Sequence, residues 1–519
     1  MNQNLAPTAA AGAPRVIPRS EHPVSRSEIS PNALRVLYRL KEAGFQAFLV
    51  GGCVRDIILG RHPKDFDVAT DALPDEVRRL FRNCRLVGRR FRLAHIVYGR
   101  EVIEVATFRA ASAPPPSEEP VPNREEDEAE LLADELASGA DDPLEATAPL
   151  QAPEQFTAAD RGGGGRGGSE QGPGGHRVQD DRGRLLRDNM YGDIDEDVWR
   201  RDFTVNSLYY NIADFSIWDY VGGLADIEAR RLRLIGDAET RYREDPVRML
   251  RAARFEAKLG FEIDRDSAAP IAQLRGLLTG VPPARLFDET AKMFLTGHGA
   301  ESYRVLRKHG LFAVLFPVVD RYLEQHPGSL VEDLLVQGLQ NTDRRVVEDK
   351  PVTPTFLYAL LLYGPIAVQI EALPPQRWHE PQAILEACDR ALREAQQRVS
   401  VPRRIALGVR EMYALQPRLE GPRGRRALRL LEQSRFRAAY DLLILRASLG
   451  LANQETAQWW TTLQAAAPAE REQMVEAAPG AARTTGAVTG NTPSAGTGTG
   501  APRRRRRRSR GGGGGGGGG

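Results

Sequence analysis

Two aspartates, Asp65 and Asp67, stand one residue apart in the segment DFD and are the residues of this chain best suited to chemistry. In an extended strand, residues two apart point to the same face, so we expect both carboxylates to project together. Paired carboxylates suit Mg²⁺, which completes its coordination shell with water and substrate phosphate. The spacing therefore predicts that Asp65 and Asp67 bind metal beside a phosphorylated substrate.

A glycine pair, Gly51-Gly52, lies between an apolar run at 48–50 and a short helix expected at 54–59. Glycines allow backbone N–H groups to approach a triphosphate closely, and the following helix turns its positive end toward the anion. A glycine pair alone usually marks a turn, and an Asp-x-Asp alone usually marks a solvated strand end. Their order of strand, turn, helix and strand favours a nucleotide site over both alternatives.

Glu104 lies in the last of three short strands expected at 84–88, 93–99 and 101–108. Alternation along the strand turns its side chain away from Ile103 and Val105. A charge beside a buried strand is costly unless a cation meets it. We interpret Glu104 either as a third acidic group near the metals or as a glutamate at the edge of the sheet.

Four motifs in register resemble those of the class II nucleotidyltransferases, which comprise the bacterial poly(A) polymerases and the CCA-adding tRNA nucleotidyltransferases. They are GG-x-V-R-D at 51–56, D-F-D at 65–67, R-R-D-F-T-x-N at 200–206 and E-D-P-x-R-x-L-R at 244–251. The resemblance extends over residues 30–460. It implies an α+β protein, in which a nucleotidyltransferase head with a small mixed or antiparallel sheet is followed by an all-α neck and body.

The resemblance also implies roles for the motif residues. In the family the aspartate of the third motif is counted as catalytic, so Asp202 is expected to join Asp65 and Asp67. From the residues alone, an N-cap aspartate that is salt-bridged to a neighbour is the favoured interpretation of Asp202. The residues expected to bind the nucleotide are Gly51, Gly52, Arg55, Arg201, Asp245, Arg248 and Arg251.

The range 243–260 is the clearest helix in the middle of the chain. Asp245 is its expected N-cap, and Gly260 its expected left-handed C-cap. Asp245 with Arg248 can hydrogen-bond the edge of a base, and in the family this helix selects the incoming nucleotide. A salt-bridged helix surface is the alternative, above all for Arg254.

Composition divides the chain into five parts. We predict a flexible lead at 1–29, a catalytic head at 30–236, a helical neck at 237–300 for nucleotide selection, an all-α RNA-binding body at 301–465 and a disordered Arg/Gly-rich tail at 466–519. Within the head, residues 111–183 are acidic and glycine-rich and have too little apolar surface to offset chain entropy, so we predict a disordered insertion there. The segments 217–227 and 230–236 look like a hairpin that closes the sheet.

The body concentrates arginine between 403 and 437, with Phe436 and Tyr440 nearby. Charge with aromatic rings suits a single-stranded RNA, through phosphate neutralisation and base stacking. Solvated helix faces with core aromatics are the alternative. The arginines expected to bind RNA are Arg403, Arg404, Arg425, Arg426, Arg435 and Arg437.

Overall composition bears on the size of the core, the redox compartment and the presence of membrane segments. The 519 residues are 41% hydrophobic, enough for a large core, and the net charge is only +2. Three cysteines at wide spacing form neither a disulfide framework nor a zinc pattern, which indicates a reducing cytoplasm. The longest apolar stretch is interrupted by Gly364-Pro365, so we expect no membrane segment.

We therefore expect the protein to add AMP from ATP to the 3′ end of RNA without a template. This is poly(A) tail synthesis, which promotes RNA processing and decay. The expected cofactors are two Mg²⁺ ions, which Mn²⁺ can replace. The expected partners are single-stranded RNA 3′ ends, ATP and RNA-decay proteins, and the expected oligomeric state is a monomer. CCA addition to tRNA is the alternative activity, since both enzymes share the four motifs. A noncatalytic RNA-binding protein on the same fold is a third reading, which the intact aspartates disfavour.

Overall fold

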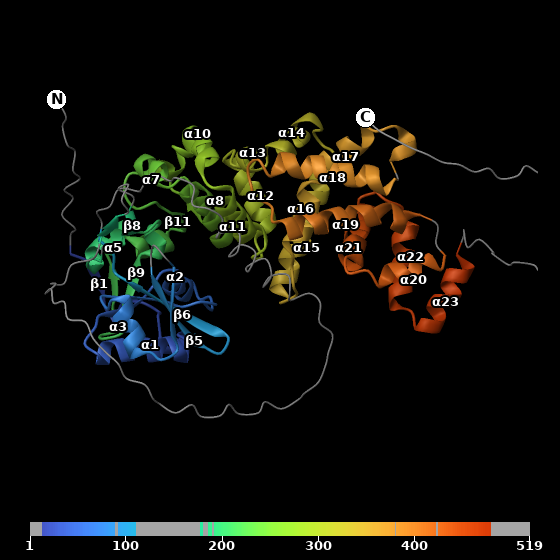
Figure 1. Ribbon diagram of the computed structural model, residues 1–519. Coiled ribbons are helices and arrows are strands. Elements are labelled where there is room, and N and C mark those ends of the chain that lie inside the picture. The colour runs from blue at the N-terminus through green and yellow to red at the C-terminus, as the bar shows by residue number, and fades with distance from the viewer. Residues whose placement is uncertain are drawn as a thin grey trace, which may run out of the picture.

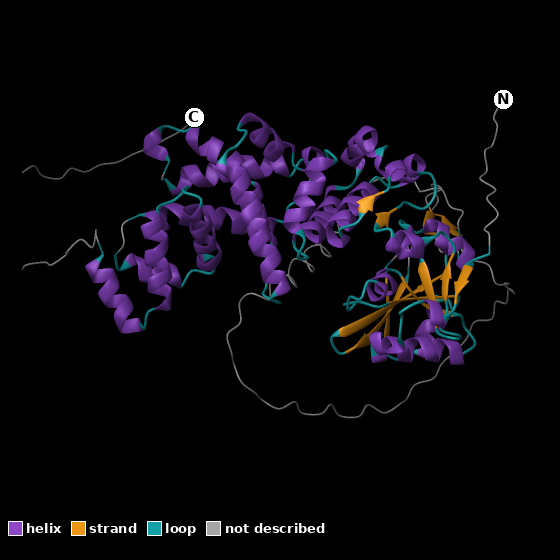
Figure 2. Ribbon diagram, turned by 180° about the vertical axis from the view of Figure 1, so that it is seen from behind, coloured by secondary structure: helices purple, strands orange, loops and turns teal. Residues whose placement is uncertain are grey.

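The computed structural model describes residues 13–88, 92–110, 191–378, 380–421 and 424–478, together with the backbone of 177–179 and 185–188. Figure 1 shows a head that contains a β-sheet at one end and helices that extend from it as an arm. In Figure 2 the strands are gathered in the head and at its junction with the arm. The predicted α+β organisation, with an all-α second half, is confirmed.

The head is built on an eight-stranded mixed sheet, larger than the small sheet expected, with the order β1-β10-β9-β2-β3-β6-β5-β4. Only the β3–β6 pair is parallel. The strands are β1 (Arg15–Ile17), β2 (Ala47–Val50), β3 (Asp67–Thr70), β4 (Cys84–Val87), β5 (Leu93–Tyr98), β6 (Glu101–Thr107), β9 (Leu208–Asn211) and β10 (Ile217–Asp219).

The two faces of this sheet are covered by different helices. Helices α1 (Pro31–Glu42) and α3 (Pro74–Leu80) pack on one face, where Leu49 and Val68 are buried. Helix α5 (Ile194–Arg200) packs on the other face, against Phe48, Val50 and Ala69. Because side chains alternate along a strand, Asp67 lies on the same face as Ala69. This face carries the candidate site.

The prediction of a flexible lead at 1–29 was wrong for residues 13–29. Strand β1 pairs antiparallel with β10 and forms an edge of the sheet. Ile17 and Val24 are buried in the core of the head. The few apolar side chains of this segment, set between prolines, gave no periodic signal, and the contacts that order them come from the sheet edge and the core of the head.

The predicted acidic insertion lies for the most part outside the described residues. The described residues on its two sides, up to Ala110 and from Tyr191, meet in the head, where Arg109 and Tyr191 form an antiparallel bridge. Strands β7 (Arg177–Gln179) and β8 (Leu185–Asp188) pair with each other. The predicted range of disorder, 111–183, therefore wrongly included β7.

The predicted hairpin between 217 and 236 does not form. The Asp219 carboxylate accepts hydrogen bonds from backbone N–H groups of the next turn, including those of Gly222 and Gly223 at 2.8 and 2.9 Å. This turn leads into α6 (Gly223–Glu228) instead of a returning strand. Strand β11 (Arg231–Leu232) then pairs in parallel with β12 (Glu262–Ile263), beyond the head sheet.

The neck and arm are helical, and among the described residues no strand follows β12. The neck begins with α7 (Ala238–Glu244), α8 (Val247–Leu259), α9 (Arg265–Ala268) and α10 (Ile271–Leu274). The arm continues through α11 (Pro283–Phe294), α12 (Gly299–Lys308), α13 (Phe312–Leu315), α14 (Pro317–Gln325), α15 (Leu330–Val347), α16 (Pro354–Leu361), α17 (Tyr363–Glu371) and α18 (Pro381–Ala395). It ends with α19 (Arg403–Glu420), α20 (Arg426–Leu431), α21 (Phe436–Ser448), α22 (Gln454–Ala465) and α23 (Pro468–Ala477). None of the helices in the described ranges combines the length and apolarity that a bilayer crossing requires.

Disorder was predicted to begin at residue 466, which is too early. Helix α23 follows, and its Val475 is buried in a cluster with Trp460 and Leu463. Arg471 donates hydrogen bonds to the carbonyl groups of Leu463 and Gln464 at 3.0 and 2.8 Å. A single apolar anchor in an Ala/Glu-rich segment gave too weak a signal in the sequence. The Arg/Gly-rich remainder lies outside the described residues.

Candidate active site

The carboxylate of Asp67 lies against the glycine bend. Val50, the last residue of β2, pairs with Asp67, the first residue of β3. Gly51 has a φ of +83° and a ψ of −140°, a conformation open essentially to glycine alone. A Cβ atom at this position would stand 3.5 Å from Oδ2 of Asp67. The predicted proximity of Asp67 to the Gly51-Gly52 turn is confirmed.

Asp65 and Asp67 flank Phe66 at the start of β3, and they are close enough for the charge of Asp65 to act on Asp67. Phe66, between them, is buried in the core of the head, whereas Asp65 is exposed and Asp67 is partly buried. The strand begins only at Asp67, so Asp65 belongs to the preceding loop and not to the strand as expected. Its negative charge still acts on Asp67.

Glu104 joins the two aspartates. Strand β6 runs beside β3, and Glu104 is paired in register with Asp67, so both carboxylates project from the same face. Because β5 flanks β6 on its other side, β6 is an interior strand, and this excludes the reading of Glu104 as an edge residue. His95 of β5 continues the row, with Nε2 3.5 Å from Oε1 of Glu104.

The electrostatics of this cluster favour a cation. The pKa of Asp67 is raised to about 6, first because burial disfavours its charge and then because Glu104 and Asp65 are negative, while Arg201 opposes the shift. Three carboxylates therefore face one guanidinium, a donor set that fits Mg²⁺. Within the described ranges, no three acidic, histidine or cysteine side chains converge closely enough to bind a metal alone. Substrate oxygens would have to complete its shell.

Arg201 is fixed beside the cluster by two partners on the same face. Its Nε donates to the Tyr209 hydroxyl at 2.7 Å, and its Nη2 donates to Oδ2 of Asp197 at 3.0 Å. Burial alone would lower its pKa, but Tyr209 and Asp197 outweigh burial and raise it. The guanidinium is thus a permanent positive charge that acts on Asp67.

Asp202 is bound to the neck by an ion pair with Arg251 of α8. Its Oδ2 accepts a hydrogen bond from Nε of Arg251 at 2.8 Å, and its Oδ1 accepts from the Phe203 N–H at 2.8 Å and from Nδ2 of Asn206 at 3.3 Å. Burial alone would raise the pKa of Asp202, but Arg251 and these hydrogen bonds lower it. The salt-bridged alternative describes this geometry, although the partner lies on α8 and is no neighbour in sequence.

Arg55, expected at the phosphates, lies in a buried network. Its side chain is only 2% exposed and donates to Oδ1 of Asp56 from Nε and Nη2, at 2.9 and 2.7 Å, and also to Oδ1 of Asn206. Its guanidinium carbon lies 5.5 Å from the ring centre of Phe255 on α8. A Cβ on Gly52 would stand 3.3 Å from Nη2. Arg55 therefore supports the glycine bend from inside the protein.

Asp245 and Arg248 of the fourth motif are close in sequence but have different partners. Oδ1 of Asp245 accepts from the Val247 N–H at 3.2 Å, which caps α8 from one residue before its formal N-cap, and Oδ2 accepts from Arg285 at 2.8 Å. Nη1 of Arg248 donates to Oε2 of Glu244 at 2.9 Å. Gly260 has a φ of +69° and ends α8 as predicted.

Arg254, the residue for which a salt-bridged helix surface was most favoured, is paired, and its side chain is only 18% exposed. Its Nε lies 3.7 Å from Oε2 of Glu289 on α11. Its guanidinium carbon lies 4.9 Å from the ring centre of Phe255. Arg254 therefore lies largely between α8 of the neck and α11 of the arm, with a smaller part of its side chain exposed than on an open helix surface.

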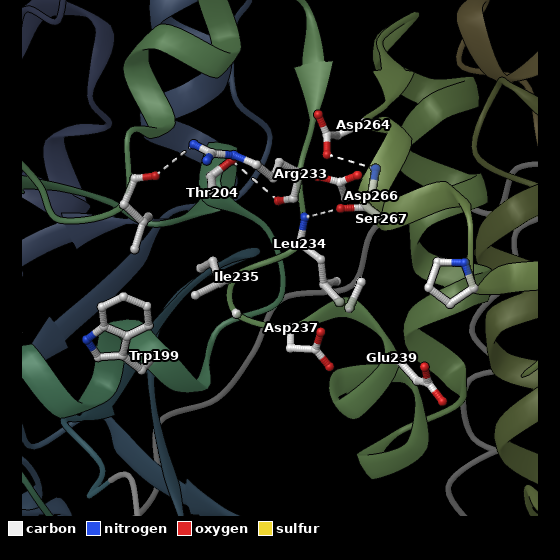
Figure 3. Close-up of a pocket in the computed structure, with 14 residues that line it drawn as sticks. Trp199, Thr204, Arg233, Leu234, Ile235, Asp237, Glu239, Asp264, Asp266 and Ser267 are labelled. Carbon is white, nitrogen blue, oxygen red and sulfur yellow. Dashed lines mark hydrogen bonds between the residues drawn. The ribbon is translucent and has the colours of Figure 1, made fainter. Parts of the chain in front are cut away.

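A separate pocket of about 520 Å³ lies where β11 and α5 meet α7 and α9 (Figure 3). Trp199, Arg233 and Glu239 line it, together with Asp237 and Asp264, which cap α7 and α9. None of the residues expected to bind metal or nucleotide is in its lining. This pocket is therefore distinct from the candidate active site.

The arginines expected to bind RNA lie on three adjacent helices of the arm, away from the head in both views (Figures 1 and 2). Arg403 and Arg404 begin α19, Arg425 and Arg426 lie at the start of α20, and Arg435 and Arg437 lie at the start of α21. Several have acidic partners: Arg425 with Glu476, Arg435 with Glu411 and Arg437 with Asp441.

The aromatic part of the RNA prediction was wrong. Phe436 and Tyr440 are buried and pack in a cluster with Trp460, so neither ring is available for base stacking. The structure therefore agrees with the alternative interpretation of these two rings, in which they are core aromatics. Helical spacing by itself does not distinguish a ring that faces RNA from a ring in a helix interface.

Sequence reasoning missed several residues of the site. Asp197, Tyr209 and Arg285 each contact a predicted residue but carry no motif of their own. Alternation along β9 places Tyr209 and Val50 on one face and was a usable signal for Tyr209. No spacing pattern connects Arg285 with Asp245, because the contact joins separate helices.

The head sheet with its paired aspartates, followed by helices, defines a nucleotidyltransferase fold. A solved tRNA-processing enzyme (apo form 2) matches this fold with a TM-score of 0.50 at 20% identity, over 85% of this chain and 99% of that chain. Three family models match the sequence: "Poly A polymerase head domain" at 47–233, "Probable RNA and SrmB- binding site of polymerase A" at 260–323 and "Polymerase A arginine-rich C-terminus" at 376–511.

Full-length relatives agree with these models. Poly(A) polymerase I of Salmonella typhi is 43% identical over 465 residues, which cover 89% of this chain and 88% of that protein. Poly(A) polymerase I of Haemophilus influenzae is 39% identical over 89% of this chain and 90% of that protein. A CCA-adding enzyme of Lactobacillus gasseri is 28% identical over 55% of each chain. The chain belongs to the poly(A) polymerase family.

Proposed function

We propose that the protein is a polynucleotide adenylyltransferase that adds AMP from ATP to the 3′ end of RNA without a template. The observation that carries this proposal is the Asp67 carboxylate against the Gly51 bend, in a chain that belongs to the poly(A) polymerase family. The 3′ oxygen forms a bond to the α-phosphorus, the bond from that phosphorus to the β-phosphate oxygen breaks, and pyrophosphate leaves.

Asp65 and Asp67 are the proposed ligands of two Mg²⁺ ions, for which Mn²⁺ can substitute, and Glu104 adds negative charge beside them. Ions held there would supply Lewis-acid chemistry, lowering the pKa of the attacking hydroxyl and neutralising charge on the leaving pyrophosphate. The raised pKa of Asp67 supports this assignment, because a cation would relieve the repulsion within the cluster.

The remaining motif residues position the nucleotide in this proposal. The backbone N–H groups at Gly51 and Gly52 face the triphosphate, and Arg201 supplies a fixed positive charge next to it. Arg55 acts indirectly, by supporting the Gly51-Gly52 bend from inside the protein. Positioning and charge neutralisation of this kind supply most of the acceleration in phosphoryl transfer.

Asp202 is assigned a different role from the catalytic one that the motif suggests. Its carboxylate oxygens are occupied by Arg251, Phe203 and Asn206. We propose that it fixes α8 to the head and thereby places Asp245 and Arg248 at the base of the incoming nucleotide. Arg251 serves the same purpose from the other side of the ion pair.

RNA binding is proposed for the neck and arm, through 260–323 and through the six arginines of α19, α20 and α21. We further propose that the protein is a monomer, that it acts in the cytoplasm and that it interacts with RNA-decay proteins. All three cysteines are free in the structure.

The test is incubation of the purified protein with Mg²⁺ and a short 3′-hydroxyl RNA and each nucleoside triphosphate in turn. We expect long ladders with ATP alone and little extension with CTP, UTP or GTP. Extension that requires CTP and is limited to tRNA would establish CCA addition instead. If no pyrophosphate is released under any condition, the noncatalytic RNA-binding alternative is correct.

A further inference from the structure

The side chains of the two residues expected to read the base, Asp245 and Arg248, are held by different partners. Arg248 is held from its own side of the neck, by Glu244 and by the Arg241 carbonyl at 2.8 Å. Asp245 is held from α11, where Nη2 of Arg285 donates to its Oδ2 at 2.8 Å. Arg285 is forty residues from Asp245 in sequence.

Arg285 ends a row of alternating charges that begins in the head. Asp202 binds Arg251, Asp245 acts on Arg251, and Arg285 binds Asp245. Burial lowers the pKa of Arg251, but the charges of Asp202, Glu289 and Asp245 outweigh it and raise this pKa. The row therefore connects the third motif, the fourth motif and α11.

The ion pair leaves Asp245 little freedom. Oδ1 is engaged by the Val247 N–H and Oδ2 by Arg285, so both the position and the rotation of the carboxylate are set. Asp245 is 24% exposed and Arg285 is 44% exposed, so the pair borders solvent and stays accessible to a nucleotide.

Adenine and cytosine each present an amino donor beside a ring nitrogen acceptor on the Watson–Crick edge. A carboxylate with a guanidinium can satisfy either pattern. The larger purine brings its amino group to a different place, so the location of the carboxylate decides which base fits. Binding sites of this kind need their groups held to within about 0.5 Å.

We propose that Arg285 is a positioning residue for base selection, which fixes the Asp245 carboxylate where it receives the amino group of adenine and not that of cytosine. The inference rests on the proposed function, in which Asp245 faces the base. It identifies α11, which contributes to none of the four motifs, as part of the ATP selection apparatus.

The experiment compares Arg285→Ala and Arg285→Lys with the wild-type enzyme, using kcat/KM for ATP and for CTP on one RNA primer. We expect the ATP-to-CTP ratio to fall about tenfold in Arg285→Ala, which corresponds to about 1.4 kcal/mol. The ATP-to-CTP ratio of Arg285→Lys should lie between those of the wild type and Arg285→Ala, because lysine keeps the positive charge but lacks the planar guanidinium donor. Arg243→Ala is the matched control, since this arginine is 57% exposed and pairs with Glu239 on α7.

Equilibrium binding of ATP and of CTP to the same proteins separates this inference from the proposed function, because binding requires no catalysis. A fall of the ATP-to-CTP affinity ratio in Arg285→Ala supports the inference even if RNA is not extended. In an Asp245→Ala background, Arg285→Ala should change the ratio no further. An unchanged ratio in correctly folded Arg285→Ala, with a raised KM for RNA, would overturn it and make Arg285 an RNA contact.

Discussion

Asp202 in the head and Arg251 in α8 form an ion pair in which the aspartate side chain is only 12% exposed. Removing one partner of such a pair leaves the other charge without compensation. We expect Asp202→Ala to lower the free energy of unfolding by about 3 kcal/mol, measured by urea denaturation.

The same variant tests the positioning role of Asp202. It should raise KM for ATP more than it lowers kcat, and Asp202→Ala with Arg251→Ala should cost less stability than the sum of the single changes. Loss of turnover with unchanged stability and unchanged KM would return Asp202 to the catalytic cluster.

Asp65→Ala and Asp67→Ala should each reduce the rate of AMP addition by roughly a thousandfold or more, because each removes a proposed ligand of the metals. RNA affinity, measured by filter binding, should stay nearly unchanged, since the arm is untouched. Asp75→Ala is the control: this aspartate is 63% exposed on α3. Chelation of divalent ions should abolish activity in the wild type and spare RNA binding. Normal extension by the Asp65→Ala protein would refute the metal assignment.

Gly51→Ala should damage both stability and activity. The new side chain must adopt a φ of +83° and stand 3.5 Å from Oδ2 of Asp67, at the surface expected to receive the triphosphate. We expect a loss of about 1–3 kcal/mol from backbone strain, measured by denaturation, and a strongly raised KM for ATP.

The Gly60→Ala variant distinguishes the effect of backbone strain from the effect of steric crowding next to Asp67. Gly60 has a φ of +69°, and a Cβ atom there would have no neighbour within 4 Å among the described residues. The variant should lose about 1–2 kcal/mol of stability and retain its KM for ATP. Equal kinetic effects of the two variants would show that strain alone accounts for the Gly51 result.

The arginines of the arm should differ in their contribution to RNA binding. Among the described residues Arg403 and Arg426 have no acidic partner, whereas Arg435 and Arg437 are paired with Glu411 and Asp441. The double variant of Arg403 and Arg426 should reduce the slope of log affinity against log salt by about 0.7 for each RNA phosphate that the variant no longer neutralises. The double variant of Arg435 and Arg437 should change this slope less, because Glu411 and Asp441 already neutralise these two charges. Equal slopes would show that RNA displaces the acidic partners.

Cys84 should be the first thiol to react in the folded protein. Burial raises the pKa of Cys53 and of Cys388 to about 12, so both thiols are protonated and shielded at pH 8. Cys84 is only half-buried, although burial raises its pKa too. Alkylation at pH 8 followed by peptide mass spectrometry should label Cys84 first, and all three residues after denaturation. Early labelling of Cys53 would indicate that the glycine bend opens in solution.

Local patterns predicted much of this molecule. Alternation placed Asp67 and Glu104 on one face, and the glycine bend beside Asp67 followed from the order of strand, turn and helix. The helices of the neck and arm followed from their spacing and from their proline and glycine boundaries. These features depend on residues close together in the chain, which a sequence displays directly.

Contacts between distant segments could not be predicted in the same way. The ion pair of Asp202 with Arg251 and that of Asp245 with Arg285 join different elements, so the sequence showed charged residues without their partners. Strand β1 and helix α23 have few apolar residues and owe their order to surfaces formed elsewhere. The turn at Asp219 was missed because its backbone hydrogen bonds, and not its apolar pattern, lead the chain into α6.

The bridge between Arg109 and Tyr191 brings the departing and returning chain together at one point of the head. The Gly192 N–H donates to the Phe108 carbonyl at 3.1 Å, so both ends are fastened independently of what connects them. Joining ends that are already adjacent costs only about 0.6 kcal/mol for each doubling of loop length. This position therefore suits protein engineering, because a reporter or an affinity module inserted between these ends would leave the contacts of Phe108 with Gly192 and of Arg109 with Tyr191 in place.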